Sequence, residues 1–241
     1  MLAMQDIGAN LERVRERMAR AAERAGRRAE DVLLVGVSKT VDVGRIRAAV
    51  AAGLGALGEN RVQEARDKVA DVGRSVQWHL VGHLQTNKVR DALELFDVIH
   101  SVDRIDLARE LDRRARAKGR TIDAFVQVNV GGELSKGGWP PEAVETAVQA
   151  VGALAGLKLR GLMTIPPAVE RPEDARSWFR TLRKLAERHG LAELSMGMSA
   201  DFEVAIEEGA TMVRVGTSIF GPRRGPAGSP PGPNHPRETR A

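Results

Sequence analysis

Lys39 is the residue whose type and position point most directly to chemistry. It closes an apolar, β-branched run at 32–38 that has the length and composition of a buried strand. An amine at the end of a buried strand is unfavourable unless it has a partner or a use. Burial lowers the pKa of a lysine and leaves a neutral amine suited to Schiff-base chemistry. The alternative is a lysine that reaches solvent from the strand end, and this run alone does not separate the two.

Lysine is scarce in this chain, which makes the position of Lys39 more informative. Of the 37 basic residues seven are lysine and the other 30 are arginine. The six remaining lysines lie in polar stretches typical of helices or loops: Lys68, Lys88, Lys118, Lys136, Lys158 and Lys184. We therefore treat Lys39 as the candidate nucleophilic amine.

Arg214 is a second charge inside an apolar run, at 212–216. The period-two alternation of a strand places it on the same face as Met212 and Gly216. A charge within a barrel strand requires a partner. Two partners fit the sequence: a carboxylate such as Glu59, or a heteroaromatic nitrogen of a ligand bound where the strands end.

Two further segments have the composition of a phosphate-binding site. Ser199 and Asp201 precede an expected helix at 202–208, and either is a plausible N-cap. Gly216 and Thr217 follow the run that contains Arg214, where glycine permits close backbone approach and the hydroxyl group can donate. Each feature alone is ordinary capping or turn chemistry, but barrels often bind phosphate after strands seven and eight.

Other kinds of catalytic site find less support. His83 and His100 are candidate acid–base groups, although a lone histidine near a strand end is often a satisfied polar residue. The sequence has no close His/Cys/Asp/Glu cluster at metal-ligand spacing and no G-x-S-x-G motif. Metal-assisted hydrolysis and a serine nucleophile are therefore poorly supported.

Short apolar runs alternate with helical patterns along the chain. The runs lie at 32–38, 56–58, 76–81, 98–102, 124–129, 159–165, 193–198 and 212–216. The helical patterns lie at 45–52, 62–72, 87–95, 104–117, 142–155, 173–189 and 202–208, after an extra N-terminal helix at 6–24. Strands alternating with helices indicate parallel β/α units. Eight strand candidates predict an α/β fold, a single (β/α)8 TIM barrel over 1–221, with its site at the carboxyl ends of the strands.

Composition limits the functional classes. The 241 residues include 42% hydrophobic residues and no cysteine, and no apolar run is long enough to span a bilayer. The N-terminus lacks a signal-peptide pattern, so we expect a cytoplasmic protein with no membrane association. The net charge of +5 lies mostly in the Pro/Gly-rich segment 222–241, which we expect to be a disordered tail. Aromatic residues make up only 3%, which disfavours nucleic-acid binding.

Seven segments together resemble one protein family in order and spacing. They are VGVSK at 35–39, GENRVQE at 58–64, WHLVGHLQTNK at 78–88, 128–138, GLM at 161–163, LSMGMS at 194–199 and VRVGTSIFG at 213–221. The chain resembles the pyridoxal phosphate homeostasis proteins, and the matching segments cover nearly all of it except the tail. The resemblance implies a fold-type III barrel like the N-terminal domain of alanine racemase, with pyridoxal 5'-phosphate (PLP) as cofactor.

The resemblance also assigns roles to individual residues. Lys39 would hold PLP as an internal aldimine, and Arg214 would face the pyridine nitrogen. Ser199, Gly216 and Thr217 would bind the phosphate. Three more residues would line the ring site: Asn60, His83 and Met163.

A non-catalytic carrier that delivers PLP to apo-enzymes is the expected function. A guanidinium does not release a proton, so Arg214 would leave the pyridine nitrogen unprotonated and the ring a weak electron sink. Racemases of this fold use a tyrosine base from a second domain, whereas this chain has no tyrosine and none of it is expected to form a second domain. The runner-up is a PLP-dependent amino-acid racemase with His83 or His100 as second base. A nucleic-acid or acidic-partner binder is a distant third, and the resemblance favours a monomer.

Overall fold

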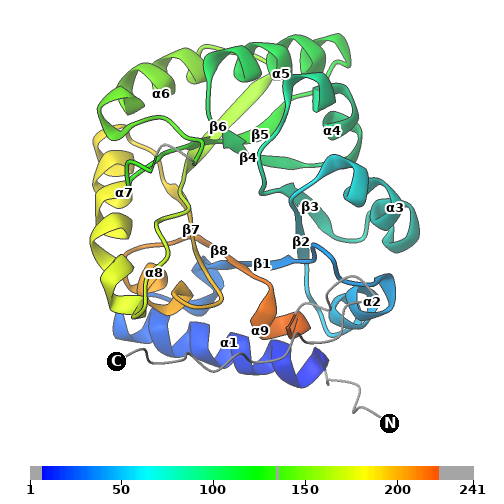
Figure 1. Ribbon diagram of the computed structural model, residues 1–241, viewed down its shortest axis with the longest axis vertical. Helices are drawn as coiled ribbons and strands as arrows, with labels where there is room; N and C mark the ends of the chain where they lie inside the picture. The colour runs from blue at the N-terminus through cyan, green and yellow to red at the C-terminus, as the bar shows by residue number, and fades with distance from the viewer. Residues whose placement is uncertain (1–6, 134–135, 223–241) are drawn as a thin grey trace, which may run out of the picture.

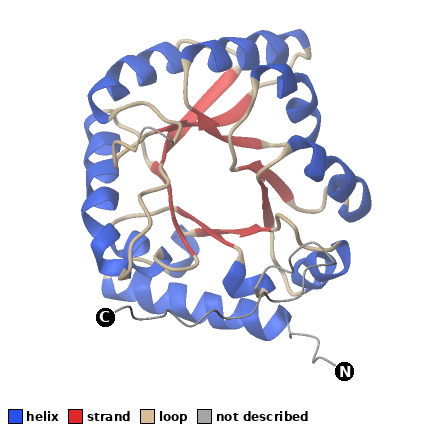
Figure 2. Ribbon diagram, in the orientation of Figure 1, coloured by secondary structure: helices blue, strands red, loops and turns tan. Residues whose placement is uncertain are grey.

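Eight parallel strands close into a barrel in the computed structural model, which describes residues 7–133 and 136–222 (Figures 1 and 2). Each strand pairs with its neighbours in sequence, and the last strand pairs with the first. The strands are β1 (Leu33–Val37), β2 (Ala56–Glu59), β3 (Gln77–Leu80), β4 (Val98–Val102), β5 (Ile122–Gln127), β6 (Leu157–Met163), β7 (Glu193–Met198) and β8 (Met212–Val215).

The helices form a ring outside the strands (Figure 2). They are α1 (Ile7–Arg24), α2 (Val43–Ala51), α3 (Val62–Val72), α4 (Val89–Leu95), α5 (Ile105–Ala117), α6 (Val144–Gly152), α7 (Arg176–Arg188), α8 (Phe202–Glu207) and α9 (Thr217–Phe220). Short 3-10 turns lie at Ala29–Asp31, Thr86–Lys88, Pro141–Ala143 and Pro172–Ala175. The predicted (β/α)8 barrel is therefore confirmed.

The extra N-terminal helix is also confirmed. An apolar stripe at helical spacing along α1 is buried: Ile7, Leu11, Val14, Met18, Ala21 and Ala22. This stripe packs α1 against α8 and α9 along the outside of the barrel (Figure 1). Arg17 adds a cation–π contact, with its guanidinium 4.6 Å from the centre of the Phe202 ring.

Most strand predictions differ from the structure by only a few residues. The short, glycine-rich second run forms β2, and all four of its residues are buried. One lysine assignment was wrong, because Lys158 lies in strand β6 with its side chain exposed. Leu157, Leu162 and Met163 supply the strand's buried side chains, so a single exposed lysine is tolerated there. The predicted tail boundary falls at the edge of the described residues, and 223–241 lie outside them.

Two apolar clusters divide the core. The larger one fills the space between the strands and the helices. The smaller one lies inside the barrel and consists of Val35, Ala56, Val98, Phe125, Met163 and Met212. Buried polar side chains from four strands also lie within the barrel: His79, His100, Ser195 and Arg214. The barrel interior is thus a packed core that includes a polar group, and not an open channel.

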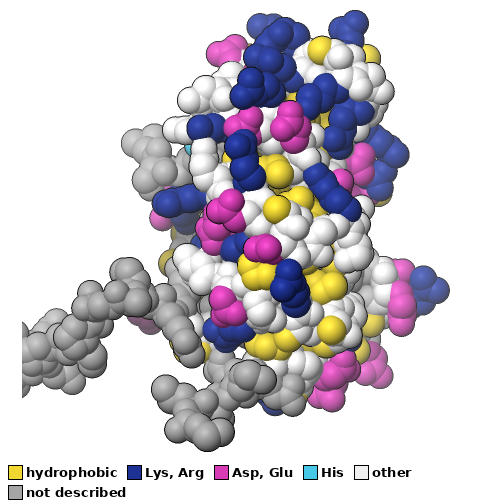
Figure 3. Space-filling view, turned by 90° about the vertical axis from the view of Figure 1, so that its right-hand side faces the viewer, with side chains coloured by type: hydrophobic (Ala, Val, Ile, Leu, Met, Phe, Trp, Pro, Cys, Tyr) yellow, Lys and Arg dark blue, Asp and Glu magenta, His cyan; other side chains and the backbone are white. Residues whose placement is uncertain are grey.

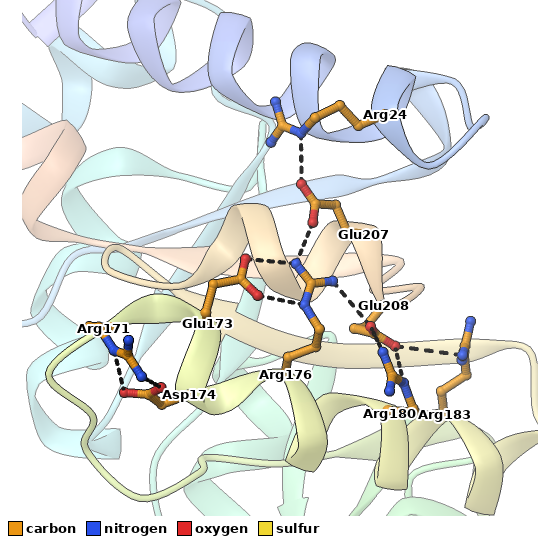
Figure 4. Close-up of polar contacts among 9 residues, drawn as sticks. All are labelled: Arg24, Arg171, Glu173, Asp174, Arg176, Arg180, Arg183, Glu207 and Glu208. Carbon is orange, nitrogen blue, oxygen red and sulfur yellow. Dashed lines mark hydrogen bonds and ion pairs between the residues drawn. The ribbon is translucent and has the colours of Figure 1, made fainter.

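Ion pairs connect the outer helices α1, α7 and α8 (Figure 4). Glu207 bridges Arg24 of α1 and Arg176 of α7, at 2.7 and 2.6 Å. Glu208 is almost fully buried and binds Arg176 and Arg180 at 3.1 and 2.8 Å. On the face in Figure 3, basic and acidic side chains are interspersed. Within the described residues no helix has the length and apolarity to cross a membrane.

Candidate functional site

A cavity of about 370 Å³ opens where the carboxyl ends of β1, β2, β7 and β8 meet. Its lining combines apolar side chains with a few polar ones, as is usual for small-molecule sites. Six of the eight predicted site residues line it: Lys39, Asn60, Ser199, Arg214, Gly216 and Thr217. These residues come from distant parts of the sequence, so the barrel is what brings them together.

Lys39 follows β1 in a tight turn and is half-buried. The N–H of Ser38 donates to the carbonyl of Gly58 at 3.0 Å, and the N–H of Val41 donates back to the carbonyl of Ser38 at 3.0 Å. Thr40 takes a left-handed conformation with φ of 62°, which is uncommon for a residue with a Cβ atom. Backbone strain beside a site residue is held in place by surrounding bonds, and this turn has several.

A buried ion-pair cluster supports this turn from behind. The Nζ of Lys68 donates to the carbonyl of Ser38 at 2.6 Å, to Oε1 of Glu59 at 2.7 Å and to Oε1 of Glu64 at 2.6 Å. Ser38 Oγ donates to the same Glu59 oxygen at 2.6 Å, and the N–H of Thr40 donates to Glu64. The residues on both sides of Lys39 are therefore fixed by one cluster.

Of the two partners that the sequence offered for Arg214, the carboxylate of Glu59 is not the one it contacts. Glu59 is engaged by Lys68 and Ser38, whereas Arg214 lies on β8 and has neutral partners. Burial raises the pKa of Glu59, and the hydrogen bonds from Lys68 and Ser38 oppose that shift. The nearby amine of Lys68, which the sequence had placed on a polar stretch, supplies the charge that Glu59 needs.

Arg214 is buried, and part of its guanidinium lines the cavity. Its Nη1 donates to Ser195 Oγ at 2.6 Å, and its Nη2 donates to the carbonyl of Thr164 at 2.8 Å. Burial lowers the pKa of Arg214 to about 10, with the charge of Asp201 acting in the opposite direction. The side chain is therefore cationic at neutral pH and keeps further N–H groups for a ligand.

The two predicted phosphate segments lie side by side. The N–H of Gly216 donates to Ser199 Oγ at 3.2 Å, which joins the segment after β7 to the one after β8. Gly216 also packs closely on β1, since a Cβ atom there would lie 3.1 Å from the carbonyl oxygen of Val37. Thr217 begins α9, and the first N–H groups of a helix have no intrahelical acceptor. Donors therefore converge at this end of the cavity.

Capping at α8 differs in detail from the prediction. Asp201 occupies the N-cap position, but its side chain makes no capping bond and accepts the N–H of Met198 at 2.6 Å. Ser199 is engaged by Gly216 instead. Asp201 thus closes the turn after β7, and burial raises the pKa of its carboxyl group.

His83 and Met163 do not line the cavity. His83 is exposed, and its Nδ1 lies 2.9 Å from Oδ2 of Asp103 in a neighbouring depression that also includes Asn60. Met163 is fully buried in the apolar cluster inside the barrel. Whether either contacts a ligand stays a prediction.

No role was predicted for His79 or Ser195, which lie behind Arg214. His79 Nδ1 lies 2.9 Å from His100 Nε2, and His100 Nδ1 lies 2.8 Å from Ser195 Oγ. Burial lowers the pKa of His79 to about 4. It lowers that of His100 as well, with a further contribution from the charges of His79 and Arg214. The inward alternation of β3 and β7 was the signal that could have identified them.

Comparisons with known proteins identify the relatives of this chain. The family model "Alanine racemase, N-terminal domain" matches residues 9–224. The pyridoxal phosphate homeostasis protein of Aquifex aeolicus is 47% identical over 221 residues, which cover 89% of this chain and 97% of that protein. PipY from Synechococcus elongatus PCC7942, whose structure is known with PLP bound, is 38% identical, with a TM-score of 0.78 over 89% of this chain and 100% of PipY.

A more distant likeness concerns the fold alone. Alanine racemase of Clostridium difficile 630 superposes with a TM-score of 0.72 at 16% identity, over 90% of this chain and 56% of the racemase. Since the close relatives match over nearly their whole length, they and not the racemase define the assignment. This chain belongs to the alanine racemase N-terminal domain family and, within it, to the pyridoxal phosphate homeostasis proteins.

Proposed function

We propose that this protein binds PLP, with Lys39 as the residue that holds it covalently, and serves intracellular PLP (vitamin B6) homeostasis. One observation supports this above the others: a half-buried amine, a buried guanidinium and a glycine–hydroxyl segment line the same cavity. The structure of PipY, a member of the same family, is known with PLP bound.

The residues present fit the chemical groups of PLP. When bound, its aldehyde supplies an electrophilic carbon that condenses with a primary amine and releases water. Lys39 is the only lysine among the cavity-lining residues described. Arg214 offers N–H donors to a ring nitrogen, and Ser199 and Thr217 offer hydroxyl groups to a phosphate. The cavity volume of about 370 Å³ lies within the range of small-ligand pockets.

The finer proposal is a non-catalytic carrier that delivers PLP to apo-enzymes. Arg214 has no proton to release to a ring nitrogen, which weakens the ring as an electron sink. The chain has no tyrosine to act as a base opposite Lys39. His100 is fully buried beneath the cavity, and His83 is exposed and bonded to Asp103. Neither histidine lies in the cavity as a second base. We also propose that the protein is monomeric and cytoplasmic.

PLP uptake and transfer test the proposal. The wild-type protein should bind PLP on titration, and borohydride should fix a pyridoxyl group on Lys39 that peptide mass spectrometry locates. Lys39→Ala should remove the adduct and slow transfer of PLP to an apo-enzyme. Lys118→Ala is the matched control, because Lys118 forms an exposed ion pair with Glu94 away from the cavity. A wild-type protein that takes up no PLP would refute the proposal.

A racemase activity is the alternative, suggested by the match to the family model of the alanine racemase N-terminal domain. Single L-amino acids incubated with the PLP-loaded protein in deuterated water distinguish the two functions. Cα exchange and racemisation at enzymatic rates would show that the protein is an enzyme and would refute the non-catalytic carrier. Exchange no faster than with free PLP would support the carrier.

A further inference from the structure

Four buried side chains from four strands form a continuous hydrogen-bonded chain under the cavity. It runs from Arg214 on β8 to Ser195 on β7, then to His100 on β4 and His79 on β3, with links of 2.6, 2.8 and 2.9 Å. The last three side chains are fully buried, and Arg214 is 4% exposed. The hydrogen-bonded chain therefore crosses the barrel interior.

The direction of the links follows from what each group can donate and accept. A guanidinium can only donate, so Ser195 Oγ accepts from Arg214. The hydroxyl hydrogen of Ser195 then needs an acceptor, and the other partner of Ser195 Oγ among the described residues is Nδ1 of His100. His100 then carries its proton on Nε2 and donates to Nδ1 of His79. His79 carries its proton on Nε2, an atom that is buried and has no partner among the described residues.

Both histidines must stay neutral for this direction to hold. A proton on Nδ1 of His100 would leave the hydroxyl hydrogen of Ser195 without an acceptor among the described residues. Burial lowers the pKa of His100 and the charge of Arg214 lowers it further, which disfavours that proton. The ring of Phe125 stacks on His100 with centres 4.9 Å apart, which holds the imidazole plane.

The chain determines how Arg214 presents its charge. Its hydrogen bonds reach a hydroxyl group and a backbone carbonyl, both neutral, through its two terminal nitrogens. These two anchors fix the guanidinium plane. The carboxylate that acts on it through space is Asp201, whose own side chain is bonded to the N–H of Met198. The cationic charge is therefore directed at the cavity without a bonded carboxylate.

We propose that Ser195, His100 and His79 are positioning residues that hold the guanidinium of Arg214 toward the ring nitrogen of bound PLP. This inference rests on the proposed function for its ligand. The hydrogen-bond direction itself rests only on contacts within the protein.

Histidine NMR of the ligand-free protein tests the chain without PLP. In 15N-labelled wild-type protein both His79 and His100 should be neutral and protonated on Nε2 from pH 6 to 9. Ser195→Ala removes the donor to His100 and should shift its Nδ1 resonance. Ser101→Ala is the matched control: Ser101 is the next residue in β4, equally buried, and its hydroxyl has no partner among the described residues. A His100 protonated on Nδ1 in the wild-type protein would overturn the proposal.

PLP titration tests the effect on the site. Ser195→Ala should weaken PLP binding about tenfold, since one hydrogen bond to a charged group is lost, and should shift the absorbance maximum of the bound PLP. Ser195→Thr should retain wild-type behaviour, and Ser101→Ala should stay within about twofold of it. Equal affinity and spectra in Ser195→Ala and Ser101→Ala would overturn the positioning role. A wild-type protein with the expected tautomers but no PLP uptake would instead refute the proposed function and the ligand assigned to Arg214.

Discussion

Replacing Lys68 with methionine should destabilise the protein strongly, although Lys68 lies outside the cavity. The substitution keeps an unbranched apolar side chain that matches the lysine stem but removes the amine that pairs with Glu59, whose side chain has no exposed surface. Breaking a buried ion pair by removing one partner costs about 3–5 kcal/mol. For a chain of this size that corresponds to a fall in melting temperature of roughly 6–20 °C.

The cost should depend on pH because Glu59 can be neutralised by a proton. Burial already raises its pKa in the folded protein above the ordinary value of 4.5, and loss of Lys68 raises it further. A raised pKa means that the folded state binds the proton more tightly than the unfolded state. The contribution of Glu59 to stability is therefore most favourable at low pH and is lost as pH rises through the folded pKa, by up to about 1.4 kcal/mol per pH unit.

Urea unfolding of the ligand-free protein at pH 5 and pH 8, followed by tryptophan fluorescence, measures both effects. Lys68→Met should lose more stability at pH 8 than at pH 5. Adding Glu59→Gln to Lys68→Met should recover most of the loss at pH 8, because no charge is then left buried. Lys118→Met, which removes an exposed ion pair, should cost less than about 1 kcal/mol. A loss in Lys68→Met below about 1 kcal/mol, or one that is the same at both pH values, would refute this account of the cluster.

Three further perturbations follow from the same contacts. Burial gives His79 a pKa of about 4 in the folded protein against an ordinary 6.5, so the unfolded state binds the proton more readily. The contribution of His79 to stability should therefore fall by about 3 kcal/mol as the pH is lowered from 6.5 to 4. Urea unfolding at several pH values should show a smaller dependence of the midpoint on pH in His79→Gln than in the wild-type protein. Glu208→Gln should cost about 1–2 kcal/mol because hydrogen bonds from Arg176 and Arg180 lose their charged acceptor (Figure 4), whereas the exposed Glu173→Gln should be close to neutral in calorimetry. Gly82→Ala should reduce PLP uptake at least about tenfold, because its Cβ atom would lie 2.4 Å from the carbonyl oxygen of Asn60; Gly152→Ala, where a Cβ atom meets nothing, should bind PLP normally.

The barrel was predictable because its signal is local. Each strand appears in the sequence as an apolar run of about six residues. The alternation of these runs with helical patterns indicates that the strands are parallel. Lys39 and Arg214 stood out for the same reason, since each is a charge at the end of or inside an apolar run. Gly216, Thr217 and Ser199 were placed by the rule that barrels bind phosphate after the last two strands.

Partner choice was not predictable because it depends on how the barrel closes. Glu59 and Arg214 looked like complementary charges, but Arg214 bonds to Ser195 on β7 and to Thr164 just after β6, and Glu59 bonds to an amine on α3. Lys68 could have been recognised from helical spacing, because it shares the buried face of α3 with Ala65 and Val69. The hydrogen bond between His100 and Ser195 joins residues 95 positions apart and has no local signal.

The two buried cations near the cavity have different kinds of hydrogen-bond partner, and this difference explains which of them can interact with a ligand. Lys68 has two carboxylates and a carbonyl around its amine, so its charge is balanced within the protein. Its hydrogen bonds hold the turn that carries Lys39 in place. Arg214 has a hydroxyl and a carbonyl, so its hydrogen bonds fix its position but leave its charge for the cavity. If Glu59 had paired with Arg214, the guanidinium would have been neutralised where an anionic ligand has to bind, and Lys39 would have lost its support. The charge of Lys68 instead stabilises the turn that carries Lys39, and the charge of Arg214 faces the cavity.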